Sequence, residues 1–254
     1  IICIDDGSTD GSGEVLDRYA EAEPRMRILR QDNGGIARAR NAGLSRASGR
    51  YVCFLDSDDY WEDDVLSELV RRADADDLDA LLYDARSVRE PGVADRTWSK
   101  YRNYYERRAY EGVFEGPRLM AAMHDVKEYR ASACLYLARR RYLTERGLSF
   151  FPGITHEDNL FTFALLLDAR RVGHSQLAFY GRRVRPNSIV TTGSRASAAH
   201  GYFVTWIEML RLLRDRDLGD AEVSLAVGAI VQGVFSSARR NTSPLPTEVI
   251  DWLA

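Results

Sequence analysis

The chain contains few cysteines and almost no lysine. Cys3, Cys53 and Cys134 are an odd number without metal-ligand spacing, which argues against a disulfide framework or a zinc site and predicts free thiols in a reducing compartment. Lys100 and Lys127 are the only lysines, and neither stands in a G-x-x-x-x-G-K-[ST] segment. This absence excludes a P-loop nucleotide site.

Membrane-spanning, secreted and nucleic-acid-binding classes find little support in the composition. No uninterrupted apolar run approaches the roughly 18 residues of a membrane-spanning helix, and no signal peptide is visible. The formal net charge of -3 argues against general nucleic-acid binding, whereas a hydrophobic share of 45% is ample for a packed core. We therefore expect a globular enzyme of the cytoplasm, acting in solution or at the inner face of the membrane.

Residues 51–59 combine a short apolar run with a group of acids at its end. Residues 51–55 are apolar or aromatic and predict a buried strand, which Asp56, Asp58 and Asp59 follow. In an open α/β sheet, ligands bind outside the carboxyl ends of the strands. Carboxylates crowded there repel one another unless a cation compensates them, and their hard oxygens suit Mg²⁺ or Mn²⁺. The alternative is a solvated acidic cap that only ends the strand.

The first residues of the chain repeat this design. Residues 1–4 are apolar and predict a second strand, which ends in Asp5 and Asp6. Farther along, Gly34 and Gly35 open a predicted helix that carries Arg40, and the N-terminus of such a helix is suited to an anion. We therefore expect both strands to bring carboxylates to one edge of the sheet.

A further pair of acids lies at the start of a later predicted helix. Glu157 and Asp158 precede a helical pattern of Leu160, Phe163 and Leu167, so both acids stand in the first turn. There they serve either as a general base or only as acids that the helix dipole stabilises.

The order of these motifs resembles a known family. DDGSTDGS (residues 5–12), DNGGIARARNAG (32–43) and GRYVCFLDSDD (49–59) are similar to the nucleotide-sugar-binding half of the family 2 glycosyltransferases. GITHEDNLF (153–161) and the segment that begins YGRRVRP at residue 180 are similar to acceptor-side segments of the same family. The resemblance covers about residues 1 to 190 and implies the GT-A fold, a three-layer α/β/α architecture.

The resemblance also implies roles on the donor side. Asp6, with Asp5 beside it, is expected to bind the base of the donor nucleotide, and Arg40 the base or the diphosphate. Asp56 is expected at the ribose or the metal, and Asp58 at a divalent cation that bridges the two donor phosphates.

On the acceptor side, the family position makes Asp158 the candidate catalytic base, with Glu157 as second choice. In an inverting transfer, such a carboxylate removes the proton of the acceptor hydroxyl as that oxygen attacks the sugar. Arg183 and Arg185, on a segment predicted to be a loop, have guanidinium groups that suit diphosphate oxygens.

The sequence thus predicts an inverting, metal-dependent glycosyltransferase. It would move a sugar from a nucleoside diphosphate donor to a hydroxyl on a glycan, lipid carrier or polymer. The favoured donor is a UDP-sugar. Two alternatives stay open: a Mg²⁺-dependent phosphoryl or nucleotidyl transferase that uses the same acids, and a non-catalytic binding module.

The predicted organisation is a transferase domain at residues 1–192 and a helical extension at 193–254. Family members usually have an earlier strand and helix, so the domain is expected to lack them. In the extension, two apolar stripes predict a helical hairpin that packs on the domain, forms a homodimer contact or, least favoured, rests on a membrane. The stripes comprise Phe203, Trp206, Ile207, Leu210 and Leu213, then Val223, Ala226, Val227, Ile230 and Val234.

Overall fold

The computed structural model describes residues 1–62, 65–186 and 195–242. The strands are β1 (Ile2–Asp5), β2 (Arg27–Arg30), β3 (Tyr51–Val52), β4 (Tyr60–Trp61), β5 (Ala80–Arg89), β6 (Tyr136–Arg139) and β7 (Val172–Val184). The helices are α1 (Ser12–Ala22), α2 (Ile36–Arg46), α3 (Leu66–Ala75), α4 (Asp95–Tyr101), α5 (Gly116–Asp125), α6 (Arg140–Glu145), α7 (Glu157–Leu167), α9 (Arg195–Leu213) and α10 (Ala221–Thr242). The order of elements is that of an α/β protein, as predicted.

The central sheet has the strand order β3-β6-β5-β7-β4, and β1 pairs with β2 in a separate parallel pair. Strand β5 runs parallel to β7 and antiparallel to β6. Side chains alternate between the two faces of a strand, so successive residues of β5 belong to different hydrophobic clusters. Leu82 packs with α5 and α7, and Leu81 packs with α3. The sheet is therefore covered by helices on both faces, the three-layer arrangement expected.

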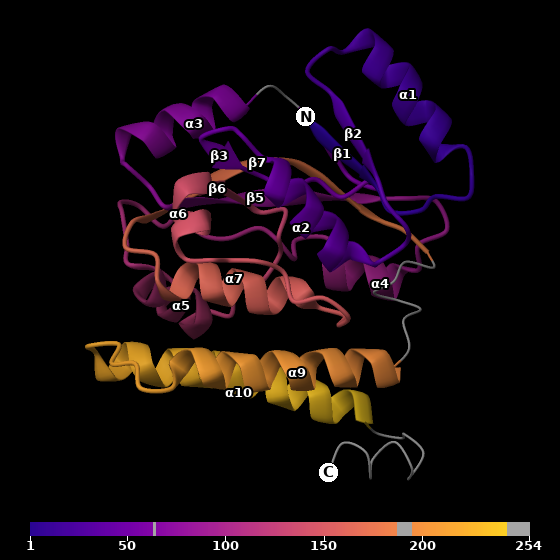
Figure 1. Ribbon diagram of the computed structural model, residues 1–254. Helices are drawn as coiled ribbons and strands as arrows, with labels where there is room; N and C mark the ends of the chain where they lie inside the picture. The colour runs from indigo at the N-terminus through magenta and orange to yellow at the C-terminus, as the bar shows by residue number, and fades with distance from the viewer. Residues whose placement is uncertain (63–64, 187–194, 243–254) are drawn as a thin grey trace.

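The two C-terminal helices add a further layer to this sandwich. Figure 1 shows α9 and α10 lying side by side beneath α5 and α7, on the side of those helices that faces away from the sheet. The apolar stripe predicted for residues 223–234 of α10 is buried and joins the same core as α5 and α7. The predicted hairpin therefore exists and packs on the rest of the chain.

The stripe predicted for the first hairpin helix is only partly right. Trp206 and Leu213 are partly buried and pack against the core, whereas Leu210 is 44% exposed. The buried residues of α9 are Ala199, Gly201, Thr205 and Met209. Three of these four are small or polar, so apolar periodicity does not mark them.

By length and hydropathy, α10 is the one helix among the described residues that could cross a membrane. The sequence prediction found no such segment. The two results differ because polar residues interrupt the apolar run of α10, although its average hydropathy is high. Of the residues in the apolar window, 39% are buried against the rest of the protein.

Two segments differ from their prediction. The strand expected at residues 51–55 covers only Tyr51–Val52. The segment from residue 172 to 184 is one strand, so Arg183 lies on β7 and not on a loop. Its pairing with β5 continues past a register shift, which keeps these residues in the sheet.

Helix α1 does not face a core. Val15 is 39% and Tyr19 65% exposed in α1, which buries no residue. The cysteines are free thiols, as predicted; Cys134 is buried, whereas Cys3 and Cys53 are only partly buried. The boundary predicted between residues 192 and 193 lies outside the described residues.

Candidate active site

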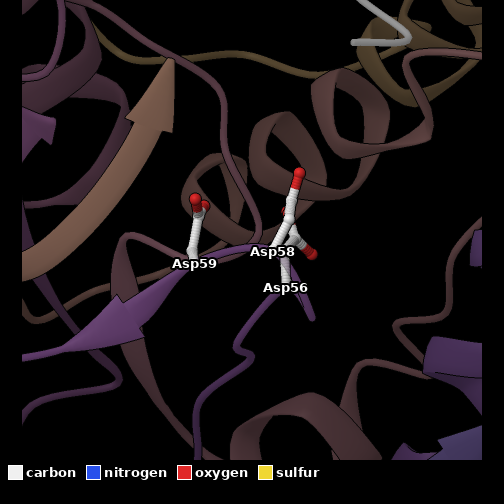
Figure 2. A group of neighbouring side chains, drawn as sticks. All are labelled: Asp56, Asp58 and Asp59. Carbon is white, nitrogen blue, oxygen red and sulfur yellow. The ribbon is translucent and has the colours of Figure 1, made fainter. Parts of the chain in front are cut away.

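Three carboxylates gather on the segment between β3 and β4. Asp56, Asp58 and Asp59 each offer one oxygen, and these oxygens lie within 4.8 Å of one another. Figure 2 shows the three side chains rising from this one segment toward the same region. The predicted acidic group is therefore formed, and it is compact enough for one cation.

The three acids are not equivalent. Both oxygens of Asp59 are engaged, one by the Tyr180 hydroxyl and the other by the backbone N–H of Arg183, each at 2.8 Å. Burial raises the pKa of Asp59, although these two donors oppose the shift. Tyr180 also accepts a hydrogen bond of 3.4 Å from the backbone N–H of Asp56. Asp59 and Tyr180 thus join the acidic segment to β7.

Asp56 and Asp58 keep more contact with solvent. The side chain of each is 37% exposed, and each carboxylate pairs with one guanidinium: Arg40 at 2.8 Å and Arg185 at 2.7 Å, respectively. Two partly exposed carboxylates on one short segment are hard oxygen ligands that leave room for water and phosphate oxygens, which is the coordination that Mg²⁺ and Mn²⁺ adopt at phosphate sites. These residues fit the divalent cation that the sequence predicts.

Arg40 joins this acidic segment to the acids of α7. Its guanidinium donates at 2.8 Å to Asp56 and at 2.6 Å to Glu157, and its side chain is only 10% exposed. The next residue, Asn41, holds α2 in place because its amide exchanges two 2.8 Å hydrogen bonds with the backbone of Phe150. We expected Arg40 at the base or the diphosphate; in the structure it bridges two carboxylates.

Glu157 and Asp158 lie side by side in the first turn of α7, as the sequence predicted, but their partners differ. Burial raises the pKa of Glu157 against the attraction of Arg40. Burial also raises the pKa of Asp158 to about 6, opposed by Arg40 and reinforced by the charge of Asp56. The Asp158 carboxylate accepts a 3.1 Å hydrogen bond from Asn159. Asp158 is thus the acid whose pKa is tuned close to neutral, which suits a base.

Asp5 and Asp6 lie at the end of β1, as predicted, and accept hydrogen bonds from different groups. Asp5 is buried and accepts a hydrogen bond from the backbone N–H of Ser8. Asp6 accepts from Gln31 at 2.6 Å and from the backbone N–H groups of Gly34 and Gly35 at 3.0 and 2.8 Å. Burial works against these donors, but together they lower the pKa of Asp6.

The end of β1 is therefore attached to the start of α2, and the same helix reaches the Asp56 segment through Arg40. Among the described residues, the close carboxylate group contains Asp56, Asp58 and Asp59 but not Asp6. Strands β1 and β3 belong to different sheets, so the expectation that both bring carboxylates to one edge of a single sheet is wrong. The two acidic strand ends are connected through α2.

The three arginines after Tyr180 contact different partners. Arg182 lies over the rings of Tyr101 and Tyr105, at 5.0 and 5.2 Å from the ring centroids. Arg183 lies over Tyr60 at 5.2 Å with its side chain 46% exposed, and Arg185 pairs with Asp58. Sequence reasoning missed the role of Tyr180; the only signal was its position at the start of the YGRRVRP segment.

Residues 1–129 match the family described as Glycosyl transferase family 2. The chain is 30% identical to the uncharacterized glycosyltransferase YibD of Escherichia coli (strain K12) over 214 residues, 84% of this chain and 61% of YibD. It therefore spans less than two thirds of the length of that relative.

Two solved structures share the fold. One is Staphylococcus aureus TarS in complex with UDP-GlcNAc, with a TM-score of 0.72 and 22% identity over 97% of this chain and 67% of that one. The other is the mannosyltransferase PcManGT from Pyrobaculum calidifontis in complex with GDP-Man and Mn²⁺, with a TM-score of 0.56 and 16% identity over 99% of this chain and 68% of that one. Because more than half of its residues match the family and its fold is shared with these enzymes, the chain belongs to glycosyl transferase family 2 and has the GT-A fold.

Proposed function

We propose that this chain transfers a sugar from a nucleoside diphosphate donor to an acceptor hydroxyl, with inversion at the sugar C1. The UDP-GlcNAc bound to TarS favours a UDP-sugar as the donor. TarS is named a poly(ribitol-phosphate) beta-N-acetylglucosaminyltransferase, which favours a polymer over a lipid-linked or free glycan acceptor here. The observation that carries the proposal is the Arg40 bridge, which joins Asp56 to the acids of α7.

The bridge separates a donor side from an acceptor side. On the donor side, Asp56 and Asp58 are the exposed members of the acidic group, and Arg185 stands beside them. A divalent cation held by Asp56 and Asp58 would supply Lewis-acid stabilisation to the leaving diphosphate. Arg185 would bind oxygens of the same diphosphate through its guanidinium fork.

On the acceptor side, the geometry favours Asp158 over Glu157 as the base. Glu157 is 7% exposed and already accepts from Arg40, so its oxygen is engaged. Asp158 has a pKa of about 6 and is therefore largely ionised at neutral pH while still basic enough to take a proton. It removes the proton of the acceptor hydroxyl while that oxygen attacks C1 from the face opposite the diphosphate.

The test is a transfer assay with UDP-GlcNAc and Mn²⁺, in which release of UDP and glycosylation of a polyol-phosphate acceptor are both measured. Asp58→Ala is expected to abolish both, because the cation loses a ligand. Asp158→Asn is expected to lower transfer at least 100-fold and leave the binding of UDP unchanged. Asp125→Asn, an exposed acid at the end of α5, is the matched control and should behave as wild type.

The same assay separates the alternatives. Release of UDP without a glycosylated product would mean that the acceptor class is wrong. Release of GlcNAc-1-phosphate would indicate a nucleotidyl transferase, and release of UMP would indicate a transferase that acts at the phosphorus of the phosphosugar. Binding of UDP without turnover of any UDP-, GDP- or dTDP-sugar would indicate a binding module, and full activity of Asp158→Asn would remove the base assignment.

We also propose the division of the chain into a transferase domain, residues 1–192, and a helical extension, residues 193–254. The buried contacts of α9 with α7 and of α10 with α5 support an extension that is packed on the domain. Location at the inner face of the membrane and a homodimer through the hairpin stay predictions.

A further inference from the structure

Helix α9 packs directly on the residues that precede the acids of α7. The Thr155 hydroxyl donates to the backbone carbonyl of Ser197 at 2.9 Å. One turn farther along, Gly201 allows an even closer approach: a Cβ added at this glycine would lie 2.2 Å from the carbonyl oxygen of Thr155. Only a residue without a side chain fits there, so the backbone of α9 is in contact with the loop.

His156 continues this contact on the side nearer the acids. It stands between Thr155 and Glu157 with φ of 64° and ψ of 32°, the left-handed region that residues other than glycine seldom adopt. Its ring is stacked on the ring of Tyr202, with centroids 4.1 Å apart and planes 16° from parallel. A strained conformation persists only where its surroundings hold it, and the Tyr202 ring is the surface against which the His156 ring packs.

The ring of Tyr202 also belongs to the surroundings of Asp158. Burial raises the pKa of the Tyr202 hydroxyl to about 12, and the charge of Asp158 adds to the shift. Burial of the His156 ring lowers the pKa of that imidazole, so His156 is neutral beside the acids at neutral pH. The stacked pair is thus an uncharged neighbour of Asp158, near enough for the charge of Asp158 to act on the Tyr202 hydroxyl.

We propose that Tyr202 is a positioning residue for catalysis: from α9 it holds His156 in its left-handed conformation and keeps water away from Asp158. The helical hairpin would then be part of the catalytic unit. This inference rests on the proposed function, in which Asp158 is the base. It assigns a role to a residue that lies outside the motifs of the transferase domain and makes no contact with the acidic segment at Asp56.

The test is the pH dependence of transfer by the full chain. Activity should fall in acid as Asp158 becomes protonated, with a midpoint near pH 6 in the wild type. Tyr202→Leu keeps apolar bulk but removes the ring stack. It is expected to lower kcat at least 10-fold and to move the acid limb to lower pH, because water that reaches Asp158 lowers its pKa toward the usual value.

Two further variants distinguish loss of the ring stack from general destabilisation of the hairpin. Tyr202→Phe keeps the ring and should retain both the rate and the acid limb. Trp206→Ala removes a ring one turn along the same helix, which packs on Phe235 of α10 at 4.6 Å. It should lower the melting temperature without moving the acid limb.

A glycine pair gives a second, independent test. Gly201→Ala forces a methyl group against the Thr155 carbonyl and should shift the acid limb as Tyr202→Leu does. Gly228→Ala makes the same change on α10, where an added Cβ meets nothing within 4 Å, and should behave as wild type. Wild-type kcat and pH profile in both Tyr202→Leu and Gly201→Ala would overturn the inference.

The failure of this inference is distinct from failure of the proposed function. If Asp158→Asn abolishes transfer while the Tyr202 and Gly201 variants are unchanged, the base assignment stands and only the role of α9 is wrong. If Asp158→Asn transfers sugar at the full rate, the base assignment fails whatever the variants of α9 do.

Discussion

The guanidinium of Arg185 lies 2.7 Å from the carboxylate of Asp58, the residue proposed to hold the divalent cation. A cation and Arg185 therefore compete for the same oxygen atoms until a diphosphate offers Arg185 a second anionic partner. The side chains are 49% and 37% exposed, so the pair is screened by solvent and its separation costs little.

The first prediction follows from this competition. Arg185→Gln should tighten the binding of Mn²⁺ in the absence of nucleotide by about 2- to 5-fold, because a modest exposed ion pair is lost. It should weaken the binding of UDP in the presence of Mn²⁺ by about 10-fold, because a charge-assisted contact to phosphate is lost. Isothermal titration measures both. Arg141→Gln, an exposed arginine paired with Glu145 on α6, is the control; parallel weakening of both ligands would contradict the competition.

The second prediction concerns the Arg40 bridge. Arg40→Met leaves the buried Glu157 without its partner and should lower the free energy of unfolding by about 3 kcal/mol. The double variant Arg40→Met with Glu157→Gln should recover part of this loss, because the unpaired buried charge is removed. Urea unfolding at pH 7 measures the free energies of the wild type, the two single variants and the double variant. Strictly additive effects of the two substitutions would mean that the residues do not interact.

The third prediction is a dependence of stability on pH that originates at Asp158. Its folded-state pKa of about 6 lies above the ordinary value of 3.8, so the fold favours the protonated form. The resulting stabilisation is complete below about pH 4 and is lost as the pH rises through 6. Relative to wild type, Asp158→Asn should therefore gain about 2 to 3 kcal/mol between pH 4 and pH 7.

Thermal unfolding at both pH values, with Asp125→Asn as control, checks this sign. A constant difference between wild type and Asp158→Asn across that range would show that the pKa of Asp158 is not raised. A gain in stability together with loss of transfer would identify Asp158 as a residue kept for activity at the expense of the fold.

The fourth prediction concerns the connection between the acidic segment and β7. Tyr180→Phe removes the hydroxyl that donates to Asp59 and should lower the free energy of unfolding by about 1 kcal/mol. The affinity for Mn²⁺ should fall several-fold, because the acidic segment loses two of the three hydrogen bonds that join it to Tyr180 and Arg183 of β7. Tyr51→Phe removes a hydroxyl that donates at 2.8 Å to the exposed Asp74 and is the matched control. Equal effects of the two substitutions would argue against a special role for Tyr180.

The sequence alone indicated those parts of the site that consist of residues close together in the chain. The acids after β1 and β3, the glycine turn before α2 and the acids at the start of α7 are each visible within a dozen residues. The partnerships between them were not visible. Arg40 and Glu157 are 117 residues apart and Tyr180 and Asp59 are 121 apart, and no local pattern specifies such pairs.

The hairpin illustrates the same limit for packing. In α10, large apolar residues at helical spacing do mark the buried face. In α9, three of the four buried residues are Ala199, Gly201 and Thr205, and at Gly201 the helix closely approaches the loop before α7. Small and polar residues carry little periodic signal, so the stripe of larger residues marked only part of the face that packs against the core.

Helix α2 fixes a distance as well as a direction. Gly34 and Gly35, which directly precede α2, bind Asp6 through their backbone N–H groups, and the second turn of α2 carries Arg40 to Asp56 and Glu157. An α-helix turns about 100° per residue, so one residue inserted between Gly35 and Arg40 would swing the guanidinium away from both acids. This short stretch therefore has a fixed length, and it should tolerate substitutions far more readily than insertions.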